Sequence, residues 1–208
     1  MKRPEPSRIL LLVTIALANV LWFATFYLAA GSFWIKIGIS TVLLAALSWW
    51  IRPVEKGQFR LNTRALLLGL LSAVVLYLLF WIGKEISTAL LPFAERQIGG
   101  IYGKGAETPR WMIFLLLLLV TGPCEELYWR GFLQDSLMER FGGRGGWLIT
   151  TALYAGVHLW SFNFVLIGAA AVAGALWGLM YWRIGALLPV IISHSLWSAV
   201  IFAVVPLA

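Results

Sequence analysis

Five ionisable side chains interrupt long apolar runs in the second half of this chain: Glu125, Glu126, Arg130, His158 and His194. An ionisable group inside a hydrocarbon layer costs about 2.5–3.5 kcal/mol even on lenient insertion scales, so each of them needs a partner or a purpose. Glu126 and Arg130 have the i, i+4 spacing of an internal salt bridge on one helix face. That interpretation leaves Glu125 unexplained, together with two histidines that fall in two other predicted helices.

Glu125, His158 and His194 are predicted to lie at one depth in the membrane. Each is ten or eleven residues from a marker of the expected cytoplasmic end of its helix; the markers are Asp135, Trp147 and Arg183. At a rise of about 1.5 Å per residue, all three sit about 15 Å from the same flank. Either histidine alone is equally well explained by a hydrogen bond inside a helix bundle. Three polar groups at one depth instead indicate a convergent site.

Such a site has the groups needed to activate water. A buried carboxylate that neighbouring cations keep ionised can accept a proton from water, as a general base must. One histidine can hold that water, and the other can donate a hydrogen bond to the oxyanion of a tetrahedral intermediate. These residue types therefore predict hydrolysis of an amide bond by water that Glu125 activates.

The composition indicates that the helices carrying these residues lie in a membrane. Of the 208 residues, 61% are hydrophobic and only 12% are charged, and the mean hydropathy is +0.88. Soluble domains are about half apolar and a quarter charged, so this chain is neither a soluble domain, a disordered chain nor a charged nucleic-acid module. The single cysteine, Cys124, excludes an intrachain disulfide scaffold. We expect an all-α polytopic bundle of about seven transmembrane helices.

The apolar runs between charged residues locate these helices. The expected spans are residues 9–30, 33–51, 65–83, 111–132, two helices within 147–182 that turn near 161–163, and 184–208. Residues 84–110 are more polar and are expected to lie partly along the membrane surface. The glycine-rich residues 142–146 are expected to form a flexible connector. Ala170, Gly174 and Gly178 recur every four residues, which favours close helix packing.

The net charge of +7 is best explained by topology rather than by an acidic partner. With a cytoplasmic N-terminus, the predicted inside Lys and Arg residues are Lys2, Arg3, Arg8, Arg52, Lys56, Arg60, Arg64, Arg130, Arg140, Arg144 and Arg183. Those outside are Lys36, Lys84, Arg96, Lys104 and Arg110. More Lys and Arg residues are predicted inside than outside, as the positive-inside rule requires. We therefore expect a multi-pass protein of the plasma (inner) membrane.

Three motifs then point to a family. Residues 125–130 (EELYWR) fit the EExxxR motif, Tyr154 to His158 fit an aromatic-xxx-His motif, and His194 to Ser198 occupy the place of a His-xxx-Asn motif. Over residues 111–208, the chain resembles the CAAX protease and bacteriocin-processing family of glutamic intramembrane endopeptidases. All three motifs occur in order within apolar spans, which makes the resemblance specific.

The resemblance implies a role for each matching residue. Glu125 would be the general base, His158 would help to position the water, and His194 would stabilise the oxyanion. Glu126 and Arg130 would be supporting residues that orient the site and balance its charge. Ser198 stands where the family usually has Asn, and its shorter side chain puts the oxyanion role of that position in doubt.

Two rival chemistries use the same residues. His158, His194 and Glu125 form a possible zinc ligand set, but there is no HExxH helix and the resembling family is regarded as metal-independent, so we expect no metal or cofactor. Cys124 could act as a nucleophile with a histidine base. Adjacent helical residues point about 100° apart, which favours a packing role for Cys124. Pro123 is expected to bend the helix near the site.

The sequence thus predicts an intramembrane endopeptidase that cuts a membrane-anchored protein or peptide, with a cavity open to the membrane or to the cytoplasmic side. Residues 1–110 would supply N-terminal helices and an extracytoplasmic segment, and residues 111–208 the catalytic helices, in one compact domain. A non-catalytic binding or immunity protein and a proton-coupled carrier are the alternatives. Expected partners are membrane lipids and the substrate, without nucleic acid. Prenylated C-termini, secreted peptides and C-terminal sorting signals all stay open as substrates.

Overall fold

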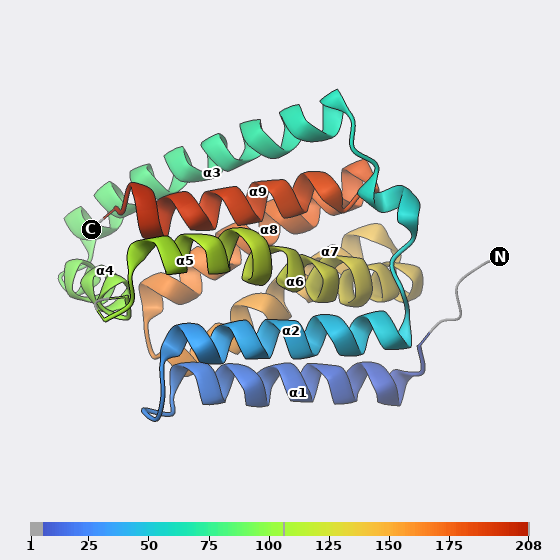
Figure 1. Cartoon of the computed structure of the whole chain (residues 1–208), viewed down its shortest axis with the longest axis horizontal. Coiled ribbons are helices and arrows are strands. Elements are labelled where there is room, and N and C mark those ends of the chain that lie inside the picture. The colour runs from blue at the N-terminus through green and yellow to red at the C-terminus, as the bar shows by residue number, and fades with distance from the viewer. Residues whose placement is uncertain (1–5, 106, 208) are drawn as a thin grey trace.

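The computed structural model describes residues 6–105 and 107–207, and within them every regular element is helical (Figure 1). The α-helices are α1 (Arg8–Phe26), α2 (Phe33–Ile51), α3 (Thr63–Leu90), α4 (Ala94–Gly103), α5 (Arg110–Leu116), α6 (Gly122–Glu126), α7 (Asp135–Val157), α8 (Phe164–Ile184) and α9 (Leu188–Ala199). Three π-helical segments, Leu117–Thr121, Leu127–Gln134 and Val200–Val204, continue α5, α6 and α9. Two 3₁₀ turns are Lys56–Phe59 and His158–Ser161.

Five of the described helical runs are long and apolar enough to cross a membrane. One of them, Arg110–Ser161, has 52 residues, about twice the length that one crossing needs. It folds back at Gly142, whose φ of 73° is a left-handed value that glycine adopts at no steric cost. The shorter apolar run Leu188–Val204 provides a further helix. The protein is therefore an integral multi-pass membrane protein with the helical bundle that the sequence predicts.

The predicted spans agree with the helices in most places. The second span and α2 share the bounds Phe33–Ile51, and the predicted turn at 161–163 contains Phe162 in a left-handed conformation with φ of 50°. The third helix is longer than predicted, because α3 continues past Gly83 to Leu90. Lys2 and Arg3, which entered the predicted charge bias, lie outside the described residues.

The expected flexible connector at 142–146 is a tight reversal instead. Apart from Gly142, these residues continue the helix, and the returning chain packs closely on what precedes it. A Cβ atom at Gly146 would lie 2.4 Å from the backbone nitrogen of Met138, and one at Gly143 would lie 2.0 Å from Nε1 of Trp182. Glycine occupies these positions because the close approach leaves no room for a side chain.

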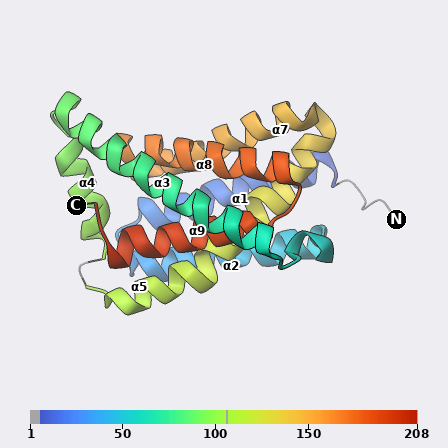
Figure 2. The same cartoon turned by 90° about the horizontal axis from the view of Figure 1, so that it is seen from above.

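The bundle has two distinct ends (Figure 1). The α4 end carries α4, the connection between α1 and α2 and the described C-terminus. The opposite end, called the N-terminal end below, carries the start of α1, the connection between α2 and α3 and the reversal at Gly142. Helix α9 lies between α3 and the segment formed by α5 and α6, and α8 runs alongside α7 in both views (Figure 2).

Small residues set the closest helix approaches. A Cβ atom at Gly69 of α3 would lie 2.6 Å from the side chain of Ile192 on α9. On α8, a Cβ atom at Gly174 would lie 2.8 Å from the ring of Tyr154 on α7. The packing role expected for the small residues of α8 is therefore confirmed for Gly174.

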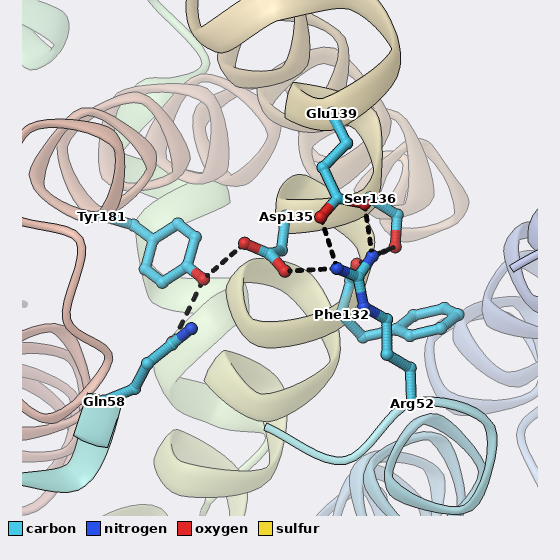
Figure 3. A network of polar contacts seen from close by, with 7 residues as sticks. All are labelled: Arg52, Gln58, Phe132, Asp135, Ser136, Glu139 and Tyr181. Atoms are coloured by element: carbon cyan, nitrogen blue, oxygen red, sulfur yellow. Dashed lines mark hydrogen bonds and ion pairs between the residues drawn. The ribbon is translucent and has the colours of Figure 1, made fainter. Parts of the chain in front are cut away.

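A polar network around Arg52 joins four elements at the N-terminal end (Figure 3). Arg52, which ends α2, donates to both carboxylate oxygens of Glu139 at 2.9 and 2.6 Å and pairs with Asp135 at 3.3 Å. Tyr181 of α8 contacts Asp135 and Gln58 through its hydroxyl, at 3.1 Å in each case. The network fastens α2 and the α2–α3 connection to α7 and α8, which carry Tyr154 and Trp177 of the site described next.

Candidate active site

Glu125 and Glu126 lie on α6, a five-residue α-helical stretch between two π-helical segments. Pro123 stands in the first turn of α6 and has no backbone N–H to donate to the preceding turn. The bend that the proline predicted takes the form of a change in helical winding, from π to α and back. Interruptions of this kind occur frequently at functional sites, where they redirect side chains that a regular helix would place elsewhere.

Glu126 is the centre of a buried three-residue ion cluster. Its Oε1 accepts a hydrogen bond from Nη1 of Arg130 at 2.7 Å and lies 2.6 Å from Nδ1 of His194. The salt bridge predicted from the i, i+4 spacing is therefore present, and it extends to a second helix. The side chain of Glu126 has no exposed surface, and that of Arg130 is 1% exposed.

Two more contacts hold this cluster rigid. Nη2 of Arg130 donates to the backbone carbonyl of Gly174 on α8 at 3.3 Å. The ring of His194 stacks on the indole of Trp177, with centroids 3.8 Å apart and planes 15° apart. Since Nδ1 of His194 faces Glu126, a protonated His194 would donate from Nε2 to a second acceptor.

Tyr154 connects Glu125 and His158. Its hydroxyl donates to Oε2 of Glu125 at 3.0 Å, and its backbone carbonyl lies 2.7 Å from Nδ1 of His158. A carbonyl oxygen can only accept, so Nδ1 of His158 carries the proton. In the neutral ring, Nε2 is then an acceptor for a water hydrogen. The Tyr154 ring also faces the Arg130 guanidinium, whose Cζ is 4.8 Å from the ring centroid.

These side chains border one cavity, whose water-accessible volume is about 120 Å³. Its lining includes Glu125, His158, His194 and Ser198, all of which are buried. A cavity of this size has room for several water molecules, and its few polar side chains, among them Glu125, His158 and His194, could bind them. The remaining lining residues come from α1, α2, α4 with its C-cap, the π-helical continuation of α5, α7, α8, and α9 with its π-helical continuation. They are Phe26, Phe33, Trp34, Ile37, Ile101, Lys104, Leu117, Thr121, Tyr154, Leu166, Ala169, Ala170, Ala173, Trp177, Trp197 and Phe202.

The cavity extends toward the α4 end of the bundle. Its lining runs from Glu125 past Phe26 and Phe33, which flank the α1–α2 connection, to the exposed Lys104. Under the predicted topology this is the extracytoplasmic end. The sequence predicted an opening to the membrane or to the cytoplasmic side; that expectation and the orientation of the bundle both stay predictions.

The structure brings the residues predicted from the motifs together, and it adds two. Glu125, His158, His194 and Ser198 share the cavity, and Glu126 and Arg130 support it from behind. Tyr154 and Trp177 were not assigned roles from sequence. Tyr154 belongs to a recognised motif, so its position in that motif was an available signal, whereas nothing local to Trp177 predicts its stacking on His194.

The rival chemistries find less support in the geometry. Cys124 is half-buried and is not among the residues that line the cavity. Among residues 6–105 and 107–207, no group of three His, Cys, Asp or Glu side chains is arranged to hold a metal ion. The zinc ligand set of His158, His194 and Glu125 therefore has no geometric counterpart in the described part of the chain.

Comparison with known families supports the motif interpretation. Residues 107–200 match the family described as type II CAAX prenyl endopeptidase Rce1-like. No curated protein and no solved structure matches the chain. The matched segment begins just before α5 and ends just after α9, so it contains every residue of the three motifs. The resemblance predicted from the sequence is confirmed for this segment: residues 107–200, just under half of the chain, match the Rce1-like, CAAX-protease family.

Proposed function

We propose that the protein is an intramembrane glutamic endopeptidase that hydrolyses a peptide bond of a membrane-associated protein or peptide. The observation that carries this proposal is the shared cavity, in which hydrogen bonds to Tyr154 and Glu126 occupy one atom each of Glu125, His158 and His194. The remaining atoms of these three side chains are left for water and substrate.

In the proposed reaction, Glu125 takes a proton from a water molecule whose other hydrogen is held by Nε2 of His158. The hydroxide oxygen forms a bond to the scissile carbonyl carbon, and the carbonyl electron pair moves to its oxygen. That oxyanion accepts hydrogen bonds from Nε2 of protonated His194 and from the Ser198 hydroxyl. The tetrahedral intermediate then collapses: the C–N bond breaks, and Glu125 returns its proton to the departing amine.

The charges of the cluster support this division of roles. Glu125 and Glu126 carry two negative charges if both are ionised, and Arg130 carries one positive charge, all of them buried. Protonation of His194 makes the group neutral, which lowers the large desolvation cost of an unbalanced buried charge. Because Nδ1 of His194 donates to Glu126, the imidazolium is also the form in which Nε2 can donate to an oxyanion.

The substrate is proposed to reach the site from the extracytoplasmic side of the plasma membrane. The basic residues Arg52, Arg60, Arg64, Arg140, Arg144 and Arg183 belong to the N-terminal end, which the positive-inside rule makes cytoplasmic. The cavity leads to the other end. This favours exported peptides or the C-terminal sorting signals of surface proteins as substrates over proteins modified in the cytoplasm.

The orientation has its own test. In a Cys124→Ser background, Glu107→Cys at the α4 end should react with a membrane-impermeant maleimide added to intact cells. Lys56→Cys, at the other end, should react only after the membrane is opened. Both positions are exposed. The reverse pattern would overturn the proposed orientation.

The proposed activity is tested by comparing protein termini in membranes of cells that express the wild type or Glu125→Gln. Termini present only with the wild type establish proteolysis and identify the substrate. Identical termini, with the variant folded and equally abundant, would overturn the proposal in favour of the non-catalytic binding protein that Ser198 motivates. A proton-coupled carrier would instead lose transport in Glu125→Gln and produce no new termini in either case.

A further inference from the structure

The cavity has a cation at its outer end that the hydrolytic mechanism does not use. Lys104 caps the C-terminus of α4 and lines the cavity together with Glu125, His158 and His194. Its side chain is exposed, so it borders both the cavity and the aqueous boundary. The other charged lining residue, Glu125, is buried and belongs to the reaction centre.

The backbone of Lys104 is fixed to the bundle. Nε1 of the buried Trp34, on α2, donates to the carbonyl oxygen of Lys104 at 3.1 Å, across 70 residues of sequence. The Lys104 ammonium lies over two aromatic rings, 5.1 Å from the centroid of Phe33 and 5.8 Å from that of Phe26. These contacts direct the cation over the cavity mouth instead of leaving it in bulk water.

This cation has no counter-ion in the described part of the chain. Its charged neighbour there is another cation, Lys36, whose ammonium donates to the carbonyl oxygen of Leu28 at 2.5 Å. Partial desolvation by the surrounding side chains, and then the charge of Lys36, lower the pKa of Lys104 below its usual value. A bound anion would relieve both effects, since it offsets the desolvation of the ammonium and the repulsion between the two lysines.

The distance from Lys104 to the reaction centre suits a short peptide segment. The Phe26 centroid lies 5.8 Å from Nζ of Lys104 and 5.6 Å from the centroid of the His158 ring. The ammonium and the imidazole are therefore at most about 11 Å apart, the sum of those two distances. An extended peptide covers that distance in about three residues, at roughly 3.3–3.6 Å per residue.

We propose that Lys104 is a specificity-determining residue that binds a carboxylate of the substrate within about three residues of the scissile bond. The inference rests on the proposed endopeptidase activity and adds the chemical class of the group that the cavity mouth recognises. The carboxylate is either the free C-terminus of the substrate or an Asp or Glu side chain. Both present the same pair of acceptor oxygens to the ammonium, and a charge-assisted hydrogen bond is the contact expected.

The test uses synthetic peptides spanning a cut that the comparison of termini assigns to Glu125. One peptide keeps every carboxylate, a second has an amidated C-terminus, and others replace each Asp or Glu near the cut with Asn or Gln. The full-length protein in detergent micelles, as wild type and as Lys104→Gln, cleaves each peptide, and KM and kcat are determined separately. Lys104→Arg tests whether the charge alone restores recognition, and Lys36→Gln removes a neighbouring cation that does not line the cavity.

With the wild type, one neutralised peptide should have a KM about tenfold higher and an unchanged kcat, as expected when a binding contact to a charged group is lost. Lys104→Gln should raise the KM of the parent peptide to a similar degree and abolish the difference between the two peptides. Lys104→Arg and Lys36→Gln should keep that difference. A merely structural Lys104 would change kcat or stability without removing the preference for the carboxylate.

Three results would overturn the inference. Lys104→Gln could discriminate between the peptides as the wild type does, or the mapped cut could have no carboxylate within three residues. In both cases the cleavage still depends on Glu125, so the proposed function stands and only the role of Lys104 falls. If no cut depends on Glu125, the proposed function fails and the recognition role fails with it.

Discussion

Arg52 and Arg130 are both almost fully buried, and both pair with carboxylates, but the surroundings of those carboxylates differ. The partners of Arg52 reach water, with side chains 17% exposed for Asp135 and 41% for Glu139. Glu126, the partner of Arg130, has no exposed surface, and its Oε2 has no hydrogen-bond partner among the described residues. Near it, Glu125 receives one hydrogen bond from the described residues, at Oε2, and lines the cavity.

The difference separates a structural network from the network of the candidate active site. At the N-terminal end, both carboxylate oxygens of Glu139 accept hydrogen bonds from the Arg52 guanidinium (Figure 3). Water can satisfy the hydrogen-bonding capacity that remains, because the Glu139 side chain is partly exposed. Glu125 and Glu126, by contrast, have carboxylate lone pairs that accept no hydrogen bond from the described residues and that bulk water does not reach. Unused polar capacity in a buried place is costly, so its presence beside a cavity indicates that a ligand or water completes it.

The largest effects are expected when the arginines themselves are removed. Arg130→Gln removes the guanidinium that pairs with the buried Glu126, and breaking such a pair costs about 3–5 kcal/mol of folding free energy. Cleavage should be lost in whatever protein remains folded. Arg52→Gln leaves carboxylates that water can reach, so its cost should be about 1–3 kcal/mol, with cleavage retained. Unfolding in detergent and peptide cleavage measure both; equal losses of activity would erase the distinction.

The next effect concerns the oxyanion. If Ser198 donates to it, Ser198→Ala should reduce kcat about 100- to 1000-fold without a comparable loss of stability. Ser195→Ala is the matched control on the same helix, because the Ser195 hydroxyl is buried, has no hydrogen-bond partner in the described chain and does not line the cavity. It should leave kcat unchanged. A normal rate in Ser198→Ala would remove that residue from the mechanism.

Two tyrosines allow the two regions to be compared by the same chemical change. Tyr154 donates its hydroxyl to Glu125, and Tyr181 donates to Asp135, at 3.0 and 3.1 Å respectively. Tyr154→Phe removes a hydrogen bond to a charged group and should reduce kcat about 10- to 100-fold. Tyr181→Phe should change kcat less than about twofold, since its partner is remote from the cavity. Similar reductions of kcat in both variants would contradict the distinction between the candidate active site and the Arg52 network.

The smallest effect is expected at Glu139. Its side chain is the most exposed member of the Arg52 network, and Asp135 also holds the guanidinium. Glu139→Gln should lower the unfolding free energy by less than about 1 kcal/mol and leave the cleavage rate unchanged. Thermal unfolding with a parallel activity measurement is sufficient. A larger loss of unfolding free energy would mean that the Arg52 network, like the candidate active site, depends on each of its charges.

Features that depend on nearby residues were predictable from the sequence. The span Phe33–Ile51 follows from a single apolar run, and the ion pair of Glu126 with Arg130 follows from the spacing along one helix. The placement of Glu125, His158 and His194 around one cavity also follows, because helices of known rise start from recognisable flanks. Their chemical roles stay predictions.

Features that depend on distant residues were not predictable. Trp177 stacks on His194 only because α8 and α9 pack together, and Lys104 reaches the cavity only because Trp34 binds the end of α4. The π-helical winding around α6 has no counterpart in apolar periodicity. Residues 142–146 read as a loop because glycine favours both flexible connections and tight ones, and only the neighbours Met138 and Trp182 distinguish the two.

The reversal at Gly142 also bears on how the protein is made. It turns the Arg110–Ser161 run into a helical hairpin that carries Glu125 on one leg and Tyr154 and His158 near the end of the other. During synthesis, the base and its tyrosine can therefore meet as soon as this hairpin has entered the bilayer. His194 and Ser198 are added later, on α9. Under the proposed mechanism, a nascent chain therefore holds the water-activating residues before the residues that would stabilise the oxyanion, and it should stay inert among other newly inserted membrane proteins until α9 has docked.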